Sequence, residues 1–458
     1  MRAALIAAAS AVLMAAATQS PSFDAARATS NDDAPGSVTV VASTPVGRLI
    51  RVPVDVATPR AAIDAAQPGD VIQLAAGTYD GGLIVPAAKH DLTIRGVDRT
   101  SVVFNGKGFR LNAIEIEGDR VTLENLSAHD FDGNGFYWEN VDGFAGRYLT
   151  VWNVSLYGIY AIGSRGGIFE HSLVSGAADA AFYVGECQPC DTTVRDVEGR
   201  LSAIGYSGTN TGAGLQLLNS TWDRNGTGIL PNSYEEQALP PPESGSRIEG
   251  NVVRHSGTVP VPANTPLAGF IGLGIGVAGG NGNAIIGNTI TDSSAYGIAL
   301  YPTLQRSGAA YAPRDNQVRG NAVSGSTKAD LAISRGVETG NCFAGNTYAT
   351  SRPPNIEQLL PCDGVPGSAE GDTSVADDLA VSVPEALDRL AAQGPRPDWR
   401  TMPAPEALPS SPDSLPDGLR SLRSDGSDAV ALVGLVGLMG GVAIILLARR
   451  RHRTHSAP

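Results

Sequence analysis

The chain has 458 residues and a net charge of −13, and this acidity argues against a nucleic-acid backbone as its partner. Only 17% of the residues are charged, which argues against long exposed helices, whereas 55 glycines and 30 prolines indicate many turns. An acidic polysaccharide would need a local basic patch or a bridging cation to bind such a chain.

Both ends of the chain carry membrane signals. Residues 1–20 combine an early arginine, an apolar run and small residues, which is typical of a secretory signal peptide, with an uncleaved anchor as the alternative. Residues 21–45 are small, polar and acidic and predict a disordered leader. Residues 429–448 are uncharged and mostly apolar, long enough to cross a bilayer, and the arginines in 449–458 predict a cytoplasmic tail. We therefore expect a single-pass protein of the cell membrane with its N-terminal domain outside the cell.

Two short helices are expected at the borders of the region between these signals. Thr58 can cap the first helix, with Pro59 at the first helical position. At the other border, residues 363–428 are rich in Pro, Ser, Asp and Ala and predict a spacer. One short helix is expected within this spacer, near residues 385–392.

The stretch from residue 135 to residue 231 contains a repeat with a step of 23 residues. Its markers are four tyrosines with mostly apolar neighbours: Tyr137, Tyr160, Tyr183 and Tyr206. An apolar–Tyr–apolar triplet follows the two-residue period of a strand. A repeat of one short strand plus turns, with little helical pattern, indicates a parallel β-helix.

The segment AAIDAAQPGDVIQLAAGTY at 61–79 resembles the opening of right-handed parallel β-helix proteins of the pectin-lyase-like superfamily. In that superfamily a short helix caps the first coil, which would otherwise expose its core and its strand edge. The segments at 92–96 and 121–126 also resemble strands of the superfamily. The resemblance, which runs from 61 to 348, implies an all-β, single-stranded right-handed parallel β-helix over 46–362. It implies no particular reaction, because the superfamily contains lyases, hydrolases, epimerases and inert structural proteins.

A second repeat, Asn/Ser-x-apolar-x-Gly-Asn-x-apolar, occurs in the later part of the chain. Its fixed asparagines are Asn251, Asn288, Asn321 and Asn346. We expect them to adopt a left-handed bend and to form a structural ladder in which each amide bonds the next coil. Insertions separate the copies, and in a solenoid they become loops that often wall the binding face. These insertions are residues 233–244, 258–266 and 302–313.

The four cysteines fit an oxidising location. We expect Cys342 and Cys362 to form a disulfide that closes the end of the repeats. Cys187 and Cys190 form a CxxC motif, which outside the cell favours a structural clip in a loop over a metal-binding or redox role.

The four tyrosines are the candidate substrate-binding residues. If the neighbouring Phe136 and Trp138 point inward, the tyrosines point outward from one sheet, in steps of about 4.8 Å. Such an aromatic strip can stack on sugar rings. The alternative is that the rings stack on one another and stabilise the coils without any ligand.

Acidic residues near the tyrosines are weaker, catalytic candidates: Asp130, Asp132, Glu139, Asp179 and Glu186. Paired carboxylates could serve acid–base chemistry or bind a cation. The first two, with Asn134, resemble the start of a calcium loop, although position 141 is a valine where the loop needs an acid. A plain turn is the alternative, so calcium is an allowed cofactor and no confident metal site follows.

The leading hypothesis is that this membrane-anchored protein binds a cell-envelope or environmental polysaccharide along the tyrosine face, with lyase, hydrolase or epimerase activity left open. The alternative is a non-catalytic surface scaffold or adhesin whose long loops contact a protein partner. A basic or carboxylate cluster centred on the tyrosines would favour an enzyme. A face without convergent polar groups would favour the scaffold.

Overall fold

The computed structural model describes residues 47–421, apart from 236, 266–270, 338 and 365–369. The predicted signal peptide, leader, membrane span and basic tail therefore lie outside the described residues. Within the part of the chain that is described, no helix is long and apolar enough to cross a membrane.

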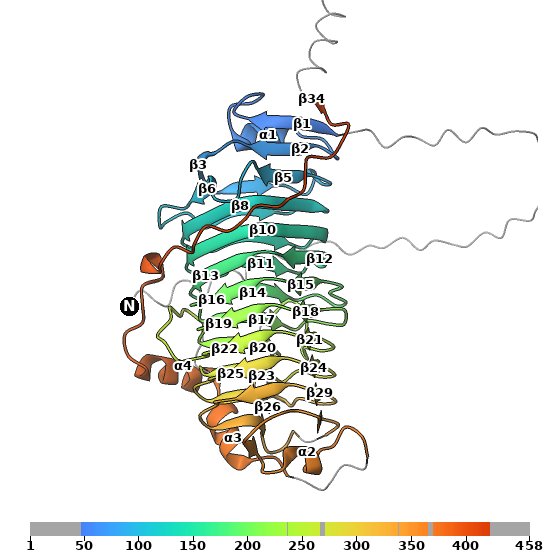
Figure 1. The fold of residues 1–458 in the computed structure, drawn as a ribbon, viewed down its shortest axis with the longest axis vertical. Coiled ribbons are helices and arrows are strands. Elements are labelled where there is room, and N and C mark those ends of the chain that lie inside the picture. Colours follow the sequence, from blue (N-terminus) through green and yellow to red (C-terminus); the bar gives the residue numbers. More distant parts are fainter. Residues whose placement is uncertain (1–46, 236, 266–270, 338, 365–369, 422–458) are drawn as a thin grey trace, which may run out of the picture. The chain divides into compact units, whose positions relative to one another are not determined.

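Parallel strands stack into a solenoid with two sheets, called here the large sheet and the small sheet (Figure 1). Each coil contributes strands to both sheets, and every strand pairs in parallel with its equivalent in the next coil. Within the described residues the large sheet has 21 strands and the small sheet has 11. The fold is thus a mostly-β parallel solenoid, as the repeats predicted.

The small sheet carries the features that matter for the site. Its strands are β4 (Leu83–Val85), β7 (Asn112–Ile116), β9 (Asn134–Glu139), β11 (Ile159–Ile162), β14 (Ala180–Gly185), β17 (Ile204–Thr209), β20 (Thr227–Asn232), β23 (Leu273–Ala278), β26 (Tyr296–Tyr301), β31 (Ala329–Ile333) and β33 (Ser351–Arg352). A short antiparallel hairpin, β27 (Thr303–Leu304) and β28 (Ala310–Tyr311), follows β26.

The large sheet forms the remaining sides of the coils. Its strands are β1 (Arg48–Val52), β2 (Val71–Leu74), β3 (Gly77–Asp80), β5 (Thr93–Gly96), β6 (Val102–Asn105), β8 (Val121–Phe131), β10 (Asp142–Val154), β12 (Arg165–Glu170), β13 (Leu173–Ala177), β15 (Thr193–Arg195), β16 (Glu198–Arg200), β18 (Gln216–Leu218), β19 (Thr221–Asp223), β21 (Arg247–Glu249), β22 (Val252–Arg254), β24 (Ala284–Ile286), β25 (Thr289–Thr291), β29 (Gln317–Arg319), β30 (Ala322–Ser324), β32 (Cys342–Ala344) and β34 (Arg420–Ser421).

The apolar core fills the interior of the coils. Alternate residues of each strand point inward, and these are mainly branched aliphatic and aromatic side chains. Phe136 and Trp138 are fully buried in this core, so the condition for an outward side chain at Tyr137 between them is met.

Helices lie at the two borders of the solenoid. Helix α1 (Pro59–Ala65) packs Ile63 into the first coils, and Thr58 Oγ1 accepts a 3.2 Å hydrogen bond from the Ala61 amide, so the predicted capping helix is confirmed. Beyond the last coils come α2 (Ile356–Leu359), α3 (Thr373–Leu379), α4 (Val383–Ala392) and the short 3₁₀ helix η2 (Trp399–Thr401). Helix α4 confirms the helix expected near 385–392.

The predicted asparagine ladder is present inside the later coils. The side chain of Asn288 accepts bonds from both the backbone and the side chain of Asn251, and its own amide bonds Asn321. The ladder ends at Glu357 of α2, which accepts two bonds from Asn346. The expected left-handed residue was wrong, however: the glycine before each asparagine has the positive φ, as at Gly250, Gly287, Gly320 and Gly345.

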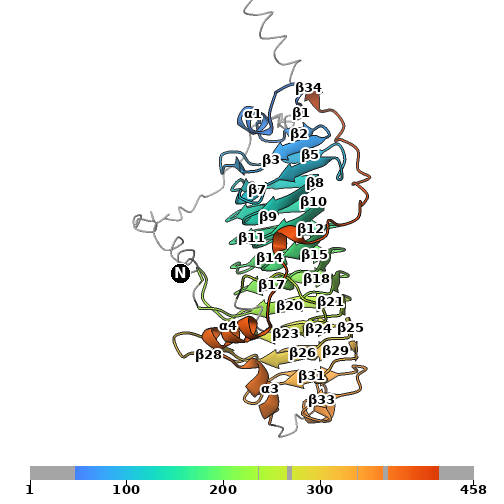
Figure 2. The same cartoon turned by 90° about the vertical axis from the view of Figure 1, so that its left-hand side faces the viewer.

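Residues 394–421, called here the strap, follow α4 and run back along the solenoid (Figures 1 and 2). The side-chain amide of Asn153 donates a 3.2 Å bond to the carbonyl of Arg400, and β34 adds in parallel to the edge of β1. These contacts contradict the prediction of a spacer over 363–428 for the described residues 370–421. The strap covers an otherwise open strand edge at the first coil.

Two disulfides join the four cysteines. Cys342 of β32 is bonded to Cys362, and Cys187 is bonded to Cys190 in the loop after β14.

Candidate functional site

Three of the four repeating tyrosines share one outward row of the small sheet. Tyr137 pairs in register with Tyr160, and Tyr160 pairs with Tyr183. The next coil is one residue longer, so Tyr206 pairs with Phe182 while Ser207 takes the outward position beside Tyr183. Because side chains alternate along a strand, this single extra residue turns Tyr206 into the core.

Tyr206 is therefore a core residue, and its prediction as an outward tyrosine was wrong. Its side chain is fully buried, and its hydroxyl donates a 3.1 Å bond to the carbonyl of Val184. Its ring packs edge-to-face against Trp222, with ring centroids 6.2 Å apart.

Tyr157, which lies outside the 23-residue repeat, packs against the three outward tyrosines of the repeat. These four residues, Tyr137, Tyr157, Tyr160 and Tyr183, are called here the tyrosine cluster. The ring of Tyr157 stacks on Tyr160 with centroids 4.4 Å apart, and Tyr137 stacks on the same ring at 4.7 Å. Tyr183 meets Tyr160 edge-to-face at 5.0 Å. The sequence gives Tyr157 no repeat signal, because it stands at the corner between β10 and β11 rather than in a strand.

The ring of Tyr183 lies over Gly185, which is two residues further along β14 and on the same outward face. A Cβ atom at position 185 would approach that ring to 2.3–2.5 Å, so only glycine leaves room for it. Tyr183 is in consequence almost completely buried, whereas Tyr137, Tyr157 and Tyr160 are half-buried.

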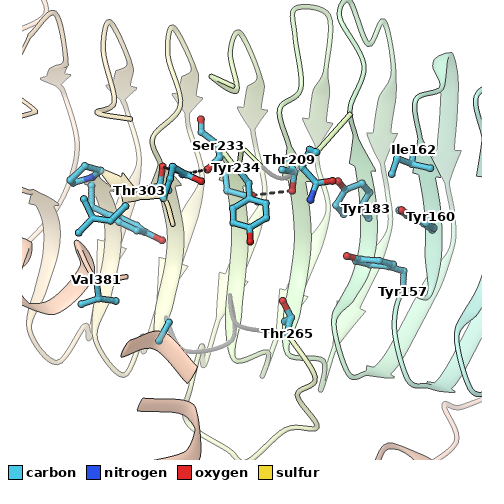
Figure 3. Close-up of a pocket in the computed structure, with 17 residues that line it drawn as sticks. Tyr157, Tyr160, Ile162, Tyr183, Thr209, Ser233, Tyr234, Thr265, Thr303 and Val381 are labelled. Carbon is cyan, nitrogen blue, oxygen red and sulfur yellow. Dashed lines mark hydrogen bonds between the residues drawn. The ribbon is translucent and has the colours of Figure 1, made fainter. Parts of the chain in front are cut away.

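A pocket of about 240 Å³ lies beside the tyrosine cluster on the outer face of the small sheet (Figure 3). Tyr157, Tyr160 and Ile162 line one end, and Tyr301 of β26 lines the pocket several coils away. Thr209 and Asn232 contribute hydroxyl and amide groups to the floor between them, and these two side chains are joined by a 2.9 Å hydrogen bond.

The three insertions predicted to wall the later coils do line this pocket. Each contributes at least one side chain: Tyr234 from the first, Thr265 from the second and Gln305 from the third. Val381 and Ala386, next to and within the C-terminal helices, line it as well. Sequence reasoning found the loops but not these residues, since the length of an insertion does not tell which of its side chains faces the sheet.

Hydrogen bonds hold the first and third insertions together. The Gln305 side-chain amide donates to the carbonyl of Ser233 at 3.1 Å, and its oxygen accepts from the amide of Glu235 at 3.1 Å. The Glu235 carboxylate in turn accepts a 3.0 Å bond from the hydroxyl of Tyr311 in the hairpin. The first and third insertions thus form one connected wall of the pocket.

Three of the candidate carboxylates surround the tyrosine cluster. Asp179 is buried, and burial raises its pKa to about 7, although hydrogen bonds with Tyr157 and Thr265 partly oppose the shift. Burial also raises the pKa of Glu186, whose carboxylate accepts a 2.9 Å bond from the amide of Ala238. Glu139 adjoins Tyr137, whose pKa rises because of burial first and the Glu139 charge second.

Two of these carboxylates each fasten an insertion. Asp179 bonds Thr265 of the second insertion, and Glu186 bonds Ala238 of the first. Their hydrogen-bonding capacity is directed at the walls, which makes them positioning residues for the pocket.

Asp130 lies near the end of β8, and Asp132 lies at the corner between β8 and β9, on the side of the strap. Asp130 bonds the side chains of His129 at 2.8 Å and Asn153 at 3.1 Å. Asp132 is 3.9 Å from the guanidinium of Arg400. Within the described residues, no three His, Cys, Asp or Glu side chains gather as a metal site would need.

Comparisons with known proteins give one family match and several similar solved structures. A family model described as a right handed beta helix region matches residues 134–305. No curated protein matches the chain. The chain is similar to the A-module of Azotobacter vinelandii mannuronan C-5 epimerase AlgE4, with 16% identity, coverage of 63% of this chain and 89% of that one, and a TM-score of 0.46.

Two further solved structures are similar at comparable levels. An alginate lyase from Paenibacillus sp. str. FPU-7 has 17% identity, coverage of 66% and 99%, and a TM-score of 0.42. The catalytic unit of a GH87 alpha-1,3-glucanase from Streptomyces thermodiastaticus has 12% identity, coverage of 64% and 66%, and a TM-score of 0.38. These likenesses carry no argument about function. Residues 134–305 are a right-handed β-helix region by the family match, and the strand register makes them part of a parallel solenoid.

Proposed function

We propose that this protein binds a polysaccharide in the pocket beside the tyrosine cluster. The observation that carries the proposal is the composition of the pocket, in which the half-buried rings of Tyr157 and Tyr160 adjoin a floor of hydroxyl and amide groups. A sugar ring has apolar C–H faces and a rim of hydroxyl groups, so it matches an aromatic surface beside donors and acceptors.

Convergent polar groups favour this function over that of an inert scaffold. Thr209 and Asn232 line the same pocket as Gln305 of the third insertion. Their donor groups bond within the protein, and their oxygens keep a second lone pair that can accept a bond from a sugar hydroxyl. A scaffold face needs no such convergence. The predicted export signals at 1–20 and 429–448, which lie outside the described residues, support the further proposal that the pocket faces the outside of the cell, where polysaccharides occur.

A second candidate function is acid–base chemistry on the bound polysaccharide. It is favoured by one observation: Asp179, with a pKa of about 7, hydrogen-bonds Tyr157, whose ring lines the pocket. A group with a pKa near neutrality can both accept and release a proton at physiological pH. Product analysis after incubation with the bound glycan would decide. Because Asp179 reaches the pocket only through Tyr157, Asp179→Asn should lower turnover and remove its pH dependence near pH 7, and unchanged turnover would contradict this role.

Calorimetric titration of the whole protein with a panel of neutral and acidic glycans tests the binding proposal. We expect Tyr160→Ala to weaken binding by about tenfold, because the loss of one aromatic contact costs roughly 1.5 kcal/mol of binding free energy. Tyr206→Phe is the matched control, since it removes only a buried hydroxyl of the core. If no glycan in the panel binds, or if binding survives Tyr160→Ala unchanged in a folded variant, the proposal fails.

A further inference from the structure

We infer that the pocket accepts the end of an uncharged glycan chain and rejects uronates and other anionic sugars. This inference rests on the proposed function and adds to it the class of ligand and the mode of entry. Two independent features of the described residues carry it: the charge around the pocket and the closure of its far end.

The first feature is the absence of cations from the wall. None of the described residues that line the pocket is Lys, Arg or His. The undescribed positions 236 and 266–270 hold a glutamate and the segment PLAGF, which add no basic residue. Arg306, next to Gln305 in the chain, is exposed and does not line the pocket.

Carboxylates, by contrast, stand on several sides of the pocket. Glu139 pairs in register with Ile162, which lines the pocket. The Glu139 side chain therefore lies beside Ile162 on the outer face of the small sheet, one coil away. Asp179 and Glu186 lie behind the tyrosine cluster, and Glu235 is in the wall between Tyr234 and the hairpin. Glu139 and Glu235 would repel an anionic sugar in a partly desolvated site, where repulsion is poorly screened, whereas the raised pKa values of Asp179 and Glu186 reduce their share of the repulsion.

Two cations of the C-terminal helices and last coils are paired with carboxylates. The ammonium group of Lys328 lies 2.7 Å from the Asp378 carboxylate. The guanidinium of Arg389 lies 2.9 Å from the Glu385 carboxylate. Neither residue lines the pocket, so neither offsets the carboxylates for a bound anion.

The second feature is the closed far end. Tyr301 and Val381 are buried where they line the pocket. Beyond them the outer face of the small sheet is covered, because Ala299 and Ala332 pack with Val375 and Leu379 of α3 in a second buried cluster. A glycan chain therefore has no path along the sheet past Tyr301.

The near end of the pocket, in contrast, leads onto the tyrosine cluster. Tyr137 is half-buried and stacks on Tyr160 one strand further out, so it extends the aromatic surface away from the pocket. The volume of about 240 Å³ is below the roughly 300–1,000 Å³ of pockets that hold drug-sized ligands, and so it admits a short piece of chain. We place the terminal sugar inside and the following sugars over Tyr160 and Tyr137.

The test titrates the full-length protein with two ladders of oligosaccharides, one to six units long. One ladder contains neutral hexose or pentose units, and the other contains uronate units. We expect the affinity for the best neutral series to rise over the first two or three units and then to level off, with no change on adding salt. Uronates of the same length should bind at least about tenfold more weakly.

The results that would contradict this inference differ from those that would contradict the proposed function. Tighter binding of uronates than of neutral sugars, or affinity that keeps rising through six units, would overturn the inference while glycan binding itself stands. Absence of binding to both ladders and to their parent polymers would overturn the proposed function as well.

A variant that adds a positive charge to the wall tests the role of charge through a gain of binding. Ile162→Lys places a cation in the pocket wall, and we expect it to improve uronate affinity by at least about tenfold over the wild type. Ile84→Lys is the matched control, because Ile84 is exposed on the same face of the small sheet but does not line the pocket. Equal uronate affinity in the two variants would contradict the role given to charge in the wall.

Discussion

Tyr157 and Tyr160 stack with ring centroids 4.4 Å apart and ring planes inclined by 20°. Tyr160 is placed by the strand β11, whereas Tyr157 is placed by the preceding corner, where its amide donates a 3.1 Å bond to the side chain of Asn134. The buried side chain of Asp179 forms a hydrogen bond with Tyr157. The aromatic surface of the site is thus held by a strand, a corner and a buried carboxylate.

Substitutions at Tyr157 should separate stacking from hydrogen bonding. Tyr157→Ala removes the ring, and we expect glycan affinity to fall by about tenfold. Tyr157→Phe keeps the ring and removes the bond with Asp179, and we expect affinity to stay within about threefold. Titration calorimetry measures both, and a greater loss in Tyr157→Phe than in Tyr157→Ala would contradict the stacking role.

The position of the tyrosine row could be predicted from the sequence, and its length could not. The constant step of 23 residues places Tyr137, Tyr160 and Tyr183 in register. One additional residue before Tyr206 then turns its side chain to the other face of the sheet. Its neighbours, Gly205 and Ser207, are not apolar like those of the other three tyrosines, which marks the departure without giving the new register. Tyr157 was missed for the opposite reason, because it reaches the cluster from a corner outside the repeat.

Stability should depend on pH through Asp179. Burial raises its pKa from 3.8 to about 7, so the folded protein holds this proton more tightly than the unfolded chain does. Its contribution to stability is complete below about pH 4 and is lost as the pH rises through about 7. Relative to the wild type, Asp179→Asn should therefore gain free energy of unfolding between pH 4 and pH 8, by at most roughly 4 kcal/mol.

Denaturant unfolding of the wild type and Asp179→Asn across this pH range provides the measurement. The comparison cancels the titration of other carboxylates, such as Glu243, whose pKa burial raises to about 7 and which both proteins retain. A difference in unfolding free energy that does not change with pH would show that Asp179 is ionised at pH 4 and would contradict the burial argument.

The asparagine ladder should contribute strongly to stability. Asn288 is buried, and its side chain makes hydrogen bonds with Asn251, Asn321 and the carbonyl of Ile248. Asn288→Ala leaves these partners buried without bonds, and we expect a loss of about 2–4 kcal/mol in unfolding free energy. Thr289→Ala, at the exposed neighbouring position, should cost under about 1 kcal/mol. Equal losses in the two variants would refute a structural role for the ladder.

The strap should be held to the solenoid by Arg99. This buried guanidinium donates to the hydroxyl of Thr150 at 2.6 Å and to the carbonyls of His171 and, in the strap, Pro409. Burial lowers its pKa to about 10. Arg99→Lys keeps the charge but cannot make all these bonds, so we expect protease cleavage within the strap to accelerate by about tenfold.

Limited proteolysis with mass analysis of the fragments measures this release. Arg314→Lys, at an exposed position away from the strap, is the control and should leave the cleavage rate unchanged. Cleavage of the wild-type strap as fast as that of Arg99→Lys would contradict the contacts described here.

The docking of the strap could not be predicted from its amino-acid composition. Residues 363–428 have few apolar side chains in any periodic pattern, which is why the sequence predicts a spacer. The described strap makes many of its contacts through hydrogen bonds with polar groups of the solenoid, such as that from the backbone amide of Ser411 to the side-chain oxygen of Asn125 at 2.7 Å. Contacts of this kind leave no hydrophobic periodicity in the sequence. The insertions were predictable because length alone marks them, whereas Tyr234, Gln305 and Tyr301 became pocket residues only through the fold.

The most direct test of the central claim is a crystal structure of the protein with the tightest-binding neutral oligosaccharide. The account predicts that the terminal sugar occupies the pocket between Tyr160 and Tyr301, with the next unit stacked on the tyrosine cluster. A sugar bound only elsewhere on the solenoid, or a chain that crosses the small sheet without entering the pocket, would contradict it.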